Sequence, residues 1–532
     1  MDLMWQEGSR FDRGTKATSL TTEIQRIMIA QEVIVAKSQE LHQVVDEIVS
    51  VVTDALREHT PIHEVEAKSL KMLLRAGQKA AQLLVDCLGN GDVGPEHQLP
   101  DGTTVKRSDE PQQREYVSIF GKIDIQRYVY VQRKGQAIEF AAVDARLALP
   151  AGKFSYLLQD WDQNFAVEEP FGQTVKMVQR ILGLKQHVDS LERMNQEMAQ
   201  QADTFQASLP VPPAEEEGEI FVQTADGKGV PIRRPADAPP IRDHQHRSGP
   251  KPDRKKMATV TAVYSINRLV RTPEQVVESL FRDPRQPGPK TPRPHPRHKQ
   301  MRALLDHVDM NGDEVDGRAA VFSWMSEQLA VRHAGSDKPI VCIMDGEEPL
   351  WIMRDVFQKD IPMIDILDLL HVTPRLWDAA MLFHPKGSRA ADTFVRERVT
   401  RILHGDVSGV VRGLRRMGTL KEVRGTKGTT LRKICRYLEK NRDRMRYDQY
   451  LACGYPIASG VIEGACRHVV KDRLERTGMN WTIPGAEAML ELRCIHLTEQ
   501  WDAFIEYRVA TETQRLYPYR DTLKTLPWQV AA

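Results

Sequence analysis

The sequence predicts a mixed α/β core flanked by helices, with a helical insertion inside it and separate helical and β-rich segments before it. Two observations predict the core: apolar β-type runs lead directly into Asp226 and Asp345, and a helix farther along the chain carries Glu463. The insertion is predicted at residues 391–450, where a helical pattern contains sixteen Lys or Arg residues against seven Asp or Glu residues.

Length and composition limit the class of protein. A chain of 532 residues is long enough for three or four domains. The formal net charge is +1, so any nucleic-acid-binding surface has to be local. Six cysteines without a Cys-x-x-Cys pair argue against a zinc ribbon and against a disulfide-stapled secreted scaffold. Because no run of about 18 apolar residues occurs, we expect a cytoplasmic protein without a membrane partner.

The amino-terminal region, residues 1–92, has the pattern of a helical hairpin. Apolar residues recur at helical spacing from Thr21 to Arg57, and a second such stretch from Ile62 to Leu88 stops at Gly89. We expect this hairpin to serve dimerisation or DNA binding and to carry no catalytic residue.

Residues 93–160 predict a β-ribbon, because the segment from Arg114 to Phe140 is rich in Val, Ile and Tyr with alternating polarity. Residues 161–208 predict two helices, Glu168 to Leu182 and Val188 to Ala202, in the outline of a helix-turn-helix. Two helices around a glycine also occur in most helical proteins, so the pattern leaves DNA binding open. The candidate groove contacts are Lys185, Gln186, His187, Arg193 and Asn195.

Residues 209–390 predict the first part of the α/β core. An acidic linker, Pro210 to Gly218, precedes it. The amphipathic segment Val315 to His333 predicts a helix, and Thr373 is expected to cap another helix with Pro374 at its first position. The strands are expected at Ile220 to Ala225, Met257 to Ile266, Pro339 to Met344 and Ile361 to Leu367.

Two basic, proline-containing stretches interrupt this core. Arg233 to Lys256 is expected to be a surface loop. Arg282 to Lys299 interleaves prolines with arginines and lysines, which excludes a helix and a central strand. It is either an extended surface linker or a segment that follows a phosphate backbone through residues such as Arg293 and Arg297.

The three acids fit one chemistry. Breaking a phosphodiester bond and joining a new one requires a deprotonated nucleophile and a stabilised leaving oxygen, and two metal ions about 4 Å apart provide both. Hard divalent cations prefer carboxylate oxygens. An RNase H-like sheet supplies them from neighbouring strands and a nearby helix, in the order of Asp226, Asp345 and Glu463. Taken singly, Asp226-Gly227 and Asp345-Gly346 are better explained as hairpin turns. Taken together with Glu463 on a helix, the two strand-end acids favour the metal site.

A helix with Ser459 as its N-cap is expected to carry Glu463 and to run to Gly478. Cations follow Glu463 at steps of four residues, and an acid that binds metal beside cations suits a polyanionic substrate. An ordinary ion pair between Glu463 and Arg467 is the alternative. The predicted DNA-binding cations of this helix are Arg467, Lys471, Arg473 and Arg476.

Four blocks of sequence point to one family. They are Asp226 to Pro231, Met344 to Gly346, Asp368 to His371, and the long block from Tyr455 to Trp481. Through these blocks, about the last three hundred residues resemble the Kra-type transposases of bacterial insertion sequences, which are related to Mutator-like transposases. The last block is long and specific, whereas the two Asp-Gly blocks are short.

The resemblance implies a DDE transposase of a bacterial, nucleoid-associated kind that binds its element ends and cuts and joins DNA. It implies that Asp226, Asp345 and Glu463 hold two Mg²⁺ or Mn²⁺ ions per active site. It also implies that Asp368 and His371 form an accessory Asp-x-x-His element; alternatively, Asp368 caps a strand end and His371 is a packed core histidine. The implied partners are double-stranded DNA, of the element ends and the target, and further copies of the chain in a homodimer or larger oligomer.

The resemblance also assigns the remaining segments. Residues 391–450 resemble the helical insertion that many relatives place before the glutamate, residues 451–485 complete the core, and residues 486–532 are expected to be a tail. Some relatives carry paired cysteines where this chain has Tyr128 to Gln132, so no zinc site is expected in the ribbon. Two rival functions remain: a domesticated or regulatory DNA-binding protein without cleavage, and an RNase H-like nuclease or resolvase that cuts without joining.

Overall fold

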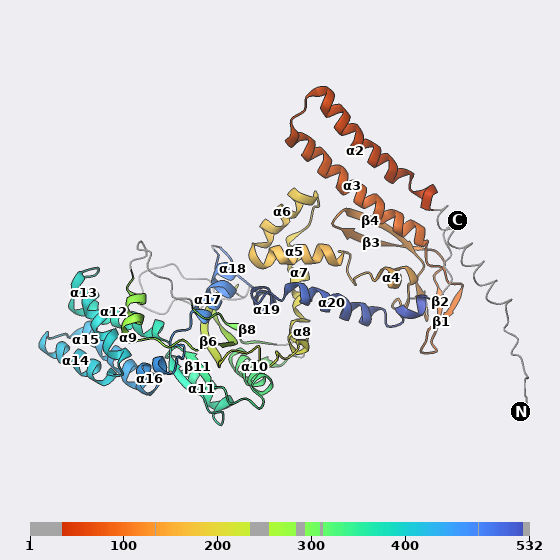
Figure 1. The fold of residues 1–532 in the computed structure, drawn as a ribbon. Helices are drawn as coiled ribbons and strands as arrows, with labels where there is room; N and C mark the ends of the chain where they lie inside the picture. The colour runs from red at the N-terminus through yellow and green to blue at the C-terminus, as the bar shows by residue number, and fades with distance from the viewer. Residues whose placement is uncertain are drawn as a thin grey trace, which may run out of the picture. The chain divides into compact units, whose positions relative to one another are not determined.

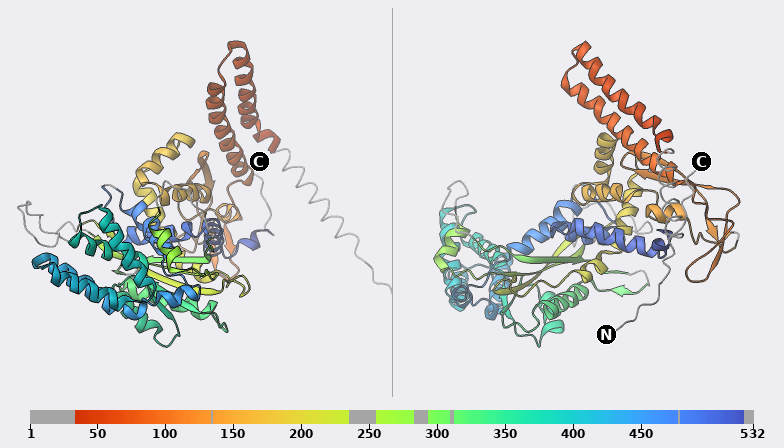
Figure 2. Two further views of the ribbon diagram at one scale, coloured as in Figure 1. Left: turned by 60° about the vertical axis from the view of Figure 1, so that its left-hand side comes forward. Right: turned by 45° about the vertical axis from the view of Figure 1, so that its right-hand side comes forward.

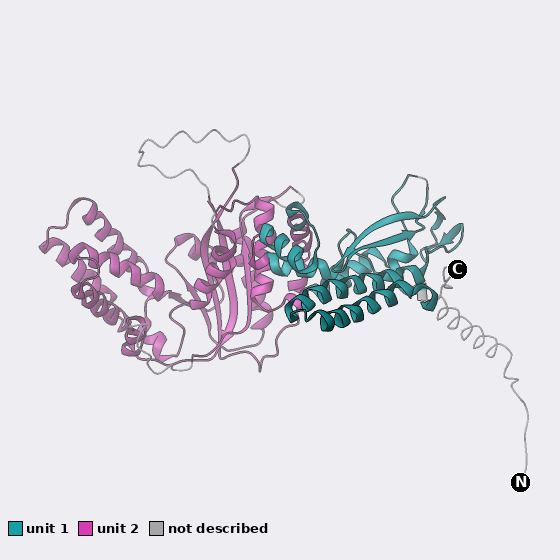
Figure 3. Cartoon of the chain, turned by 90° about the horizontal axis from the view of Figure 1, so that it is seen from above, with its two compact units in different colours: residues 1–166, 171–191, 505–532 teal, residues 167–170, 192–504 magenta. Residues whose placement is uncertain are grey.

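The chain divides into two compact units, which Figure 3 distinguishes by colour. Unit 1 comprises residues 1–166, 171–191 and 505–532, and unit 2 comprises residues 167–170 and 192–504. No helix among the described residues is long and apolar enough to cross a membrane. The computed structural model describes residues 34–133, 135–234, 255–282, 293–308, 312–476 and 478–524.

The predicted helical hairpin forms part of unit 1 (Figure 1). Helices α2 (Gln39–Glu58) and α3 (Ile62–Leu88) pack against each other, and α3 ends at Gly89 as predicted. The predicted start of the first helix at Thr21 lies outside the described residues. An ion pair between Arg75 and Glu47, at 2.6 Å, joins the two helices across the hairpin.

The predicted β-ribbon is also present in unit 1. Strands β3 (Gln112–Ser118) and β4 (Gly121–Arg127) pair antiparallel, and Ile123 and Ile125 pack with Val85 of α3. A separate sheet has three strands in the order β1-β2-β5, of which β1 and β2 precede the ribbon in the chain and β5 follows it. The strands of that sheet are β1 (Glu96–Gln98), β2 (Thr104–Arg107) and β5 (Tyr130–Val131).

Two helices lie on either side of Gly183, as the helix-turn-helix pattern predicted. Two of the candidate groove contacts are wrong, because Gln186 and Asn195 are buried. The side-chain amide of Gln186 donates a hydrogen bond to Asp162 Oδ2 at 2.7 Å, which explains its burial. Lys185 is exposed. The helices of this region are α4 (Ala142–Leu147), α5 (Tyr156–Glu168), α6 (Phe171–Leu182), α7 (Val188–Ala199) and α8 (Ala202–Ser208).

A five-stranded mixed sheet of order β12-β11-β6-β7-β8 forms the core of unit 2. Strands β6, β7 and β8 are antiparallel, whereas β11 runs parallel to both β6 and β12. The four predicted strands are confirmed. The strands of the sheet are β6 (Ile220–Pro231), β7 (Lys255–Ile266), β8 (Arg297–Leu304), β11 (Ile340–Met344) and β12 (Ile364–Leu367), and a small ribbon pairs β9 (His307–Val308) with β10 (Glu314–Val315).

The two hairpin-turn alternatives are wrong. Asp226 lies inside the continuous strand β6, where it pairs with Val260 of β7. Asp345 follows the last residue of β11 and leads into a helix, α11 (Glu348–Gln358), so no strand returns there.

Helices cover both faces of the sheet (Figures 1 and 2). Helix α10 (Gly317–Arg332), which confirms the predicted amphipathic helix, lies with α11 on one face, and α17 (Gly460–Ala465) and α19 (Ile483–Leu497) lie on the other. Ala225 belongs to the apolar cluster with α10 and α11. Because side chains alternate along a strand, its neighbours Thr224 and Asp226 face α17.

The basic insertion is helical, as predicted, and Figure 2 shows its helices grouped together at one end of unit 2. The helix before it, α12 (Leu369–Phe383), starts at Leu369 with Asp368 as N-cap. The predicted cap at Thr373 is therefore wrong, and Pro374 lies inside the helix. The insertion comprises α13 (Arg389–Leu403), α14 (Val407–Leu420), α15 (Gly425–Lys440), η1 (Arg442–Arg444) and α16 (Tyr447–Ala452).

The segment expected as a tail, residues 486–532, is largely helical in its described part. Helix α19 packs against β8 and buries residues such as Met489 and Leu490 in the core of unit 2. The last elements of the chain are α20 (Trp501–Leu516) and η3 (Arg520–Lys524).

One further helix, α9 (Pro273–Leu280), follows β7.

The predicted acidic linker ends in a buried ion pair. Glu217 is 5% exposed, and its two carboxylate oxygens accept hydrogen bonds from Arg332 Nε and Nη2 of α10 at 2.8 and 3.0 Å. Ser265 of β7 donates a third hydrogen bond to Glu217 at 2.5 Å. Glu217 therefore joins the linker to the core and is not part of a solvated acidic run.

We expect Glu217→Ala to lower the free energy of unfolding of the protein by about 3–5 kcal/mol, because the Arg332 charge would stay buried without its partner. Urea titration followed by tryptophan fluorescence measures this change. The matched control is Glu215→Ala, an exposed acid two residues earlier, for which the change should stay within about 0.5 kcal/mol. Equal effects of the two substitutions would contradict a structural role of the buried pair.

Candidate active site

Asp226 and Asp345 lie side by side on neighbouring strands. In the parallel pairing of β11 with β6, Met344 lies opposite Ala225. The next residue on each strand is an aspartate, so both carboxylates stand at one level and on the same face of the sheet. Two acids that the sequence separates by more than a hundred residues are thereby brought together.

The carboxyl group of Asp345 is partly buried, and its ionisation is disfavoured. Burial raises the pKa of Asp345 to about 6, and the nearby charges of Glu347 and Asp226 raise it as well. The backbone N–H of Glu347, which donates to Asp345 Oδ1 at 2.7 Å, and His371 act in the opposite direction. The accumulation of negative charge on Asp226, Asp345 and Glu347 is the setting in which carboxylates attract a cation.

Cys466 contacts Asp226, a contact that was not predicted from the sequence. The Cys466 Sγ atom lies 3.4 Å from Asp226 Oδ2, and the backbone N–H of Gly227 donates to Asp226 Oδ1 at 2.8 Å. Burial and the Asp226 charge raise the pKa of the Cys466 thiol, which keeps it a neutral hydrogen-bond donor. Its position three residues after Glu463, one helical turn away, was the available sequence signal.

The helix that carries Glu463 departs from the predicted regular helix. After α17, residues Cys466–Lys471 form a π-helix, a short α18 (Asp472–Leu474) follows, and the helical region ends before the predicted Gly478. A π-helical turn widens the backbone and occurs often at functional sites. Glu463 itself is exposed, and Ser459 caps α17 as predicted by accepting a hydrogen bond from Ile462 N at 3.2 Å.

Arg493 of α19 stabilises the π-helical segment. Its buried guanidinium donates from Nε to the carbonyl oxygens of His468 and Val469, at 2.9 and 3.1 Å. A second hydrogen bond joins Arg493 Nη2 to the same His468 carbonyl. Because a widened helix leaves carbonyls without their regular partners, a buried arginine provides the missing donors.

A buried polar network ties the start of the Glu463 helix to Thr224 of β6 and to Asp368, the N-cap of α12. Asp368 Oδ1 accepts a hydrogen bond from Leu370 N at 2.8 Å, and Asp368 Oδ2 accepts one from Ser459 N at 3.0 Å. The hydroxyls of Ser459 and Thr224 lie 3.1 Å apart, and Thr224 stands two residues before Asp226. Asp368, Ser459 and Thr224 are each at most 1% exposed. This Asp368–Ser459–Thr224 network fixes where α17 begins relative to the sheet.

The Asp-x-x-His element divides into two roles. Asp368 caps α12 and holds Ser459, so the alternative in which it only caps a strand end is wrong. His371 Nδ1 lies 4.0 Å from Asp345 Oδ2, and the His371 side chain is 30% exposed. His371 is thus a neighbour of Asp345 at the rim of the site and not a packed core histidine.

The basic insertion reaches the turn after Asp345. A Cβ atom at Gly346 would lie 2.3 Å from the ring of Tyr437 in α15, so a larger residue at this position would displace that ring. Burial raises the pKa of Tyr437 to about 12, and the Asp345 charge contributes to the shift. Tyr437 therefore covers one side of the acidic site with a neutral aromatic side chain.

The chemistry of the three acids suits a hard divalent cation, because carboxylate oxygens are the ligands that Mg²⁺ and Mn²⁺ prefer. Asp226 and Asp345 stand at one level on the same face of the sheet. Within the described ranges, no group of three or more His, Cys, Asp and Glu side chains converges tightly enough to hold a metal. Glu463 is exposed, and its side chain takes no part in the buried network described above.

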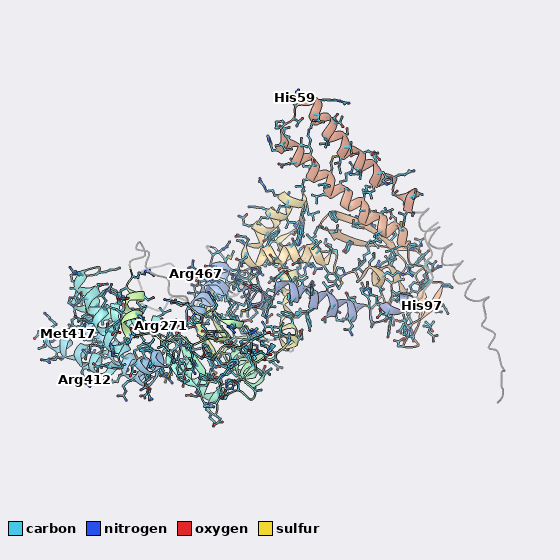
Figure 4. The ribbon with its side chains drawn as sticks, in the orientation of Figure 1. His59, His97, Arg271, Arg412, Met417 and Arg467 are labelled. Atoms are coloured by element: carbon cyan, nitrogen blue, oxygen red, sulfur yellow. The ribbon has the colours of Figure 1, made fainter. Side chains whose placement is uncertain are left out.

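The four predicted cations after Glu463 do not form one surface. Arg467, labelled in Figure 4, and Lys471 are exposed, and Arg467 Nε lies 3.6 Å from Asp472 Oδ1. Arg473 is fully buried, and burial lowers its pKa to about 9, so its predicted DNA contact is wrong. Arg476 is half-buried and bonded to Glu169 at 2.6 Å.

The other predicted DNA-binding residues lie away from the acids or in separate segments. Arg193 is exposed on α7. Arg297 is the first residue of the edge strand β8. On that strand Ala303 pairs with Val260, which in turn pairs with Asp226. Arg297 lies six residues before Ala303, so about 20 Å along the strand separates Arg297 from the level of Asp226. Arg293 is exposed and donates to Ser279 Oγ at 2.8 Å. Residues 283–292 and 235–254 of the two basic stretches lie outside the described residues.

Comparisons with known proteins do not identify the chain. No family model matches its sequence, and no curated protein matches it.

We expect Asp368→Ala to loosen the start of the Glu463 helix, because the buried N–H of Ser459 would lose its acceptor, at a cost of about 1–3 kcal/mol. Hydrogen exchange of the segment 457–465, followed by mass spectrometry, should speed up at least about tenfold. The control is Asp406→Ala, which removes the N-cap of α14 by breaking its bond to Gly409 N at 2.9 Å. This control should leave exchange at 457–465 unchanged. If Asp368→Ala also leaves it unchanged, the network does not hold the helix.

Proposed function

We propose that this chain is a DDE transposase, a metal-dependent enzyme that cleaves and joins DNA strands. The observation that carries the proposal is the pairing of Asp226 with Asp345 at one level of two parallel strands, beside a helix that carries Glu463. The helix is held at that position by Asp368, Ser459 and Cys466. Carboxylates from two neighbouring strands and one adjacent helix are the arrangement that two-metal phosphoryl chemistry requires.

We further propose that unit 2 has an RNase H-like fold. Three antiparallel strands are followed by two parallel ones, and β6, the first of these five strands along the chain, occupies the centre of the sheet, in the order β12-β11-β6-β7-β8. The helical insertion between β12 and the Glu463 helix agrees with the Kra-type and Mutator-like resemblance of the sequence. These features support the fold assignment without a sequence match to a known family.

Each residue of the site has a distinct role in this proposal. Asp226 and Asp345 provide oxygens for divalent ions, and Glu463 completes the ligand set when its exposed side chain turns toward them. Bound Mg²⁺ or Mn²⁺ would activate the attacking oxygen and neutralise the charge that develops on the leaving oxygen. Arg467 and Lys471 offer exposed positive charge to the DNA backbone next to Glu463.

A DNA-binding protein without cleavage is the second candidate. The observation in its favour is that no three ligating side chains converge on a metal position in the described part of the chain. Strand-cleavage assays with element-end DNA distinguish the two candidates, because binding alone would leave the DNA intact.

We expect Asp226→Asn, Asp345→Asn and Glu463→Gln each to reduce metal-dependent cleavage and joining by about 1,000-fold, since each loss removes several kcal/mol of transition-state stabilisation. DNA affinity, measured by fluorescence anisotropy, should change little. The control is Glu327→Gln, an exposed acid of α10, which should keep full activity. Full activity in any of the three variants would remove that residue from the catalytic set.

We expect divalent-ion binding to weaken as the pH falls through about 6, because the raised pKa of Asp345 leaves this carboxyl protonated below that value. An unperturbed aspartate would remain ionised down to about pH 4. Titration calorimetry with Mg²⁺ at pH 5, 6 and 8 should give affinities that fall by up to about tenfold per pH unit below 6. The pH dependence between 5 and 7 should disappear in Asp345→Asn, and its persistence there would assign the effect to another group.

A further inference from the structure

The helical hairpin of unit 1 carries two stripes of exposed apolar side chains. On α2 the stripe residues are separated by four, three and four positions, which is the spacing of a helix-bundle seam. Their exposed fractions range from 46% to 74%. The stripe residues are Val45, Val49, Val52 and Leu56 on α2, and Leu70 and Leu73 on α3.

The two stripes lie on the same face of the hairpin. Each stripe residue directly follows a residue turned toward the other helix: Val45 follows the buried Val44, and Leu73 follows the partly buried Met72. Advancing by one residue turns the direction of the side chain by about 100° around the helix axis, in the same sense along each helix. Because α2 and α3 run in opposite directions, both rotations lead to the same side of the pair. The apolar face therefore lies along the part of the hairpin that leads to its tip, near His59 in Figure 4.

The β-ribbon covers only the other end of this face. Gln78 and Gln82 of α3 donate hydrogen bonds to the carbonyl oxygens of Lys122 and Asp124 on β4, at 2.8 and 2.9 Å. The ring of Phe120 lies against Gly77, where any Cβ atom would approach it to 2.6 Å. The residues between Gly77 and the tip extend beyond these contacts, and there the stripes are exposed.

Charge on the hairpin favours a second copy over DNA. Helix α2 carries five acidic residues against one basic residue, Arg57, so it repels a phosphate backbone. The half of α3 near the tip carries Lys68, Lys71 and Arg75 against Glu64 and Glu66. If α2 of one copy lies against α3 of another, acidic and basic residues flank each apolar seam.

The size of the face also fits self-association. Six half-exposed Val and Leu side chains present on the order of 500 Å² of apolar surface, which equals the largest patch on most monomers. A twofold contact buries such a patch on both copies, about 1,000 Å² of apolar surface in total, which is the lower bound for a biological interface. A twofold axis also lets one surface serve both partners.

We propose that the apolar face formed by Val45, Val49, Val52, Leu56, Leu70 and Leu73 docks on the same face of a second copy of this chain, forming an antiparallel four-helix bundle. The hairpin then holds two copies together through a surface that contains none of the candidate active-site residues. This inference is independent of the proposed chemistry.

Sedimentation velocity of the full chain, without metal or DNA, tests the proposal. We expect a dimer at micromolar concentration and association weaker by about tenfold or more in the double variant V49S/L73S, with unchanged helical content by circular dichroism. The matched control is V356S on α11, where Val356 is also exposed, at 64%; this variant should remain dimeric. A wild-type chain that stays monomeric, or a double variant that stays dimeric, overturns the proposal.

Hydrogen exchange of the wild-type chain gives a second measurement that does not depend on a variant. Residues 45–73 should become protected as the concentration rises through the dimerisation range. Protection that is independent of concentration would mean that another part of the same chain covers the face, and protection that requires duplex DNA would mean a DNA contact. Either result overturns the second-copy assignment.

Discussion

The parallel pairing of β11 with β6 is the constraint on which the candidate site depends. It sets Met344 opposite Ala225 and so brings Asp345 to the level of Asp226. A shift of one residue in this register would turn one carboxylate to the opposite face of the sheet, into the apolar layer of α10 and α11. The apolar residues on that layer, such as Trp351 and Phe322, therefore protect the register and indirectly the site.

The third acid depends on a different kind of interaction. Glu463 follows a long helical insertion, so nothing in the local sequence fixes its helix against the sheet. Buried polar contacts do this instead, through Ser459 at the start of the helix and Arg493 along its π-helical part. Such groups are costly to bury without partners, and that cost restricts the helix to the one position in which they are satisfied.

The site combines rigid and adjustable parts. The two aspartates stand on a central and a neighbouring strand of the sheet, whereas Glu463 is exposed on a short helix that precedes a π-helical turn. Tyr437 and His371 limit the space around Asp345 from the side of the insertion and of α12.

The sequence alone determined four of the five strands of the unit 2 sheet, the helical hairpin, the helical insertion and the order of the three acids, because hydrophobic periodicity and residue type are local properties. It did not predict the edge strand β8. It left Asp226 and Asp345 open to a turn interpretation, since an Asp-Gly pair looks the same in a hairpin and at a strand end. Strand pairing decided that question.

Only the tertiary structure decided which polar residues are buried. Arg473, Gln186 and Glu217 are of residue types usually found on the surface, yet they are buried. Gln186 and Glu217 have partners in other segments, Asp162 and Arg332, and the Arg473 guanidinium lies over the ring of Trp481. It also revealed Cys466 beside Asp226 and the role of Asp368 in holding Ser459. These contacts join residues that are far apart in the sequence, and the physical reason they escape prediction is that burial depends on packing between segments, not on the periodicity within one.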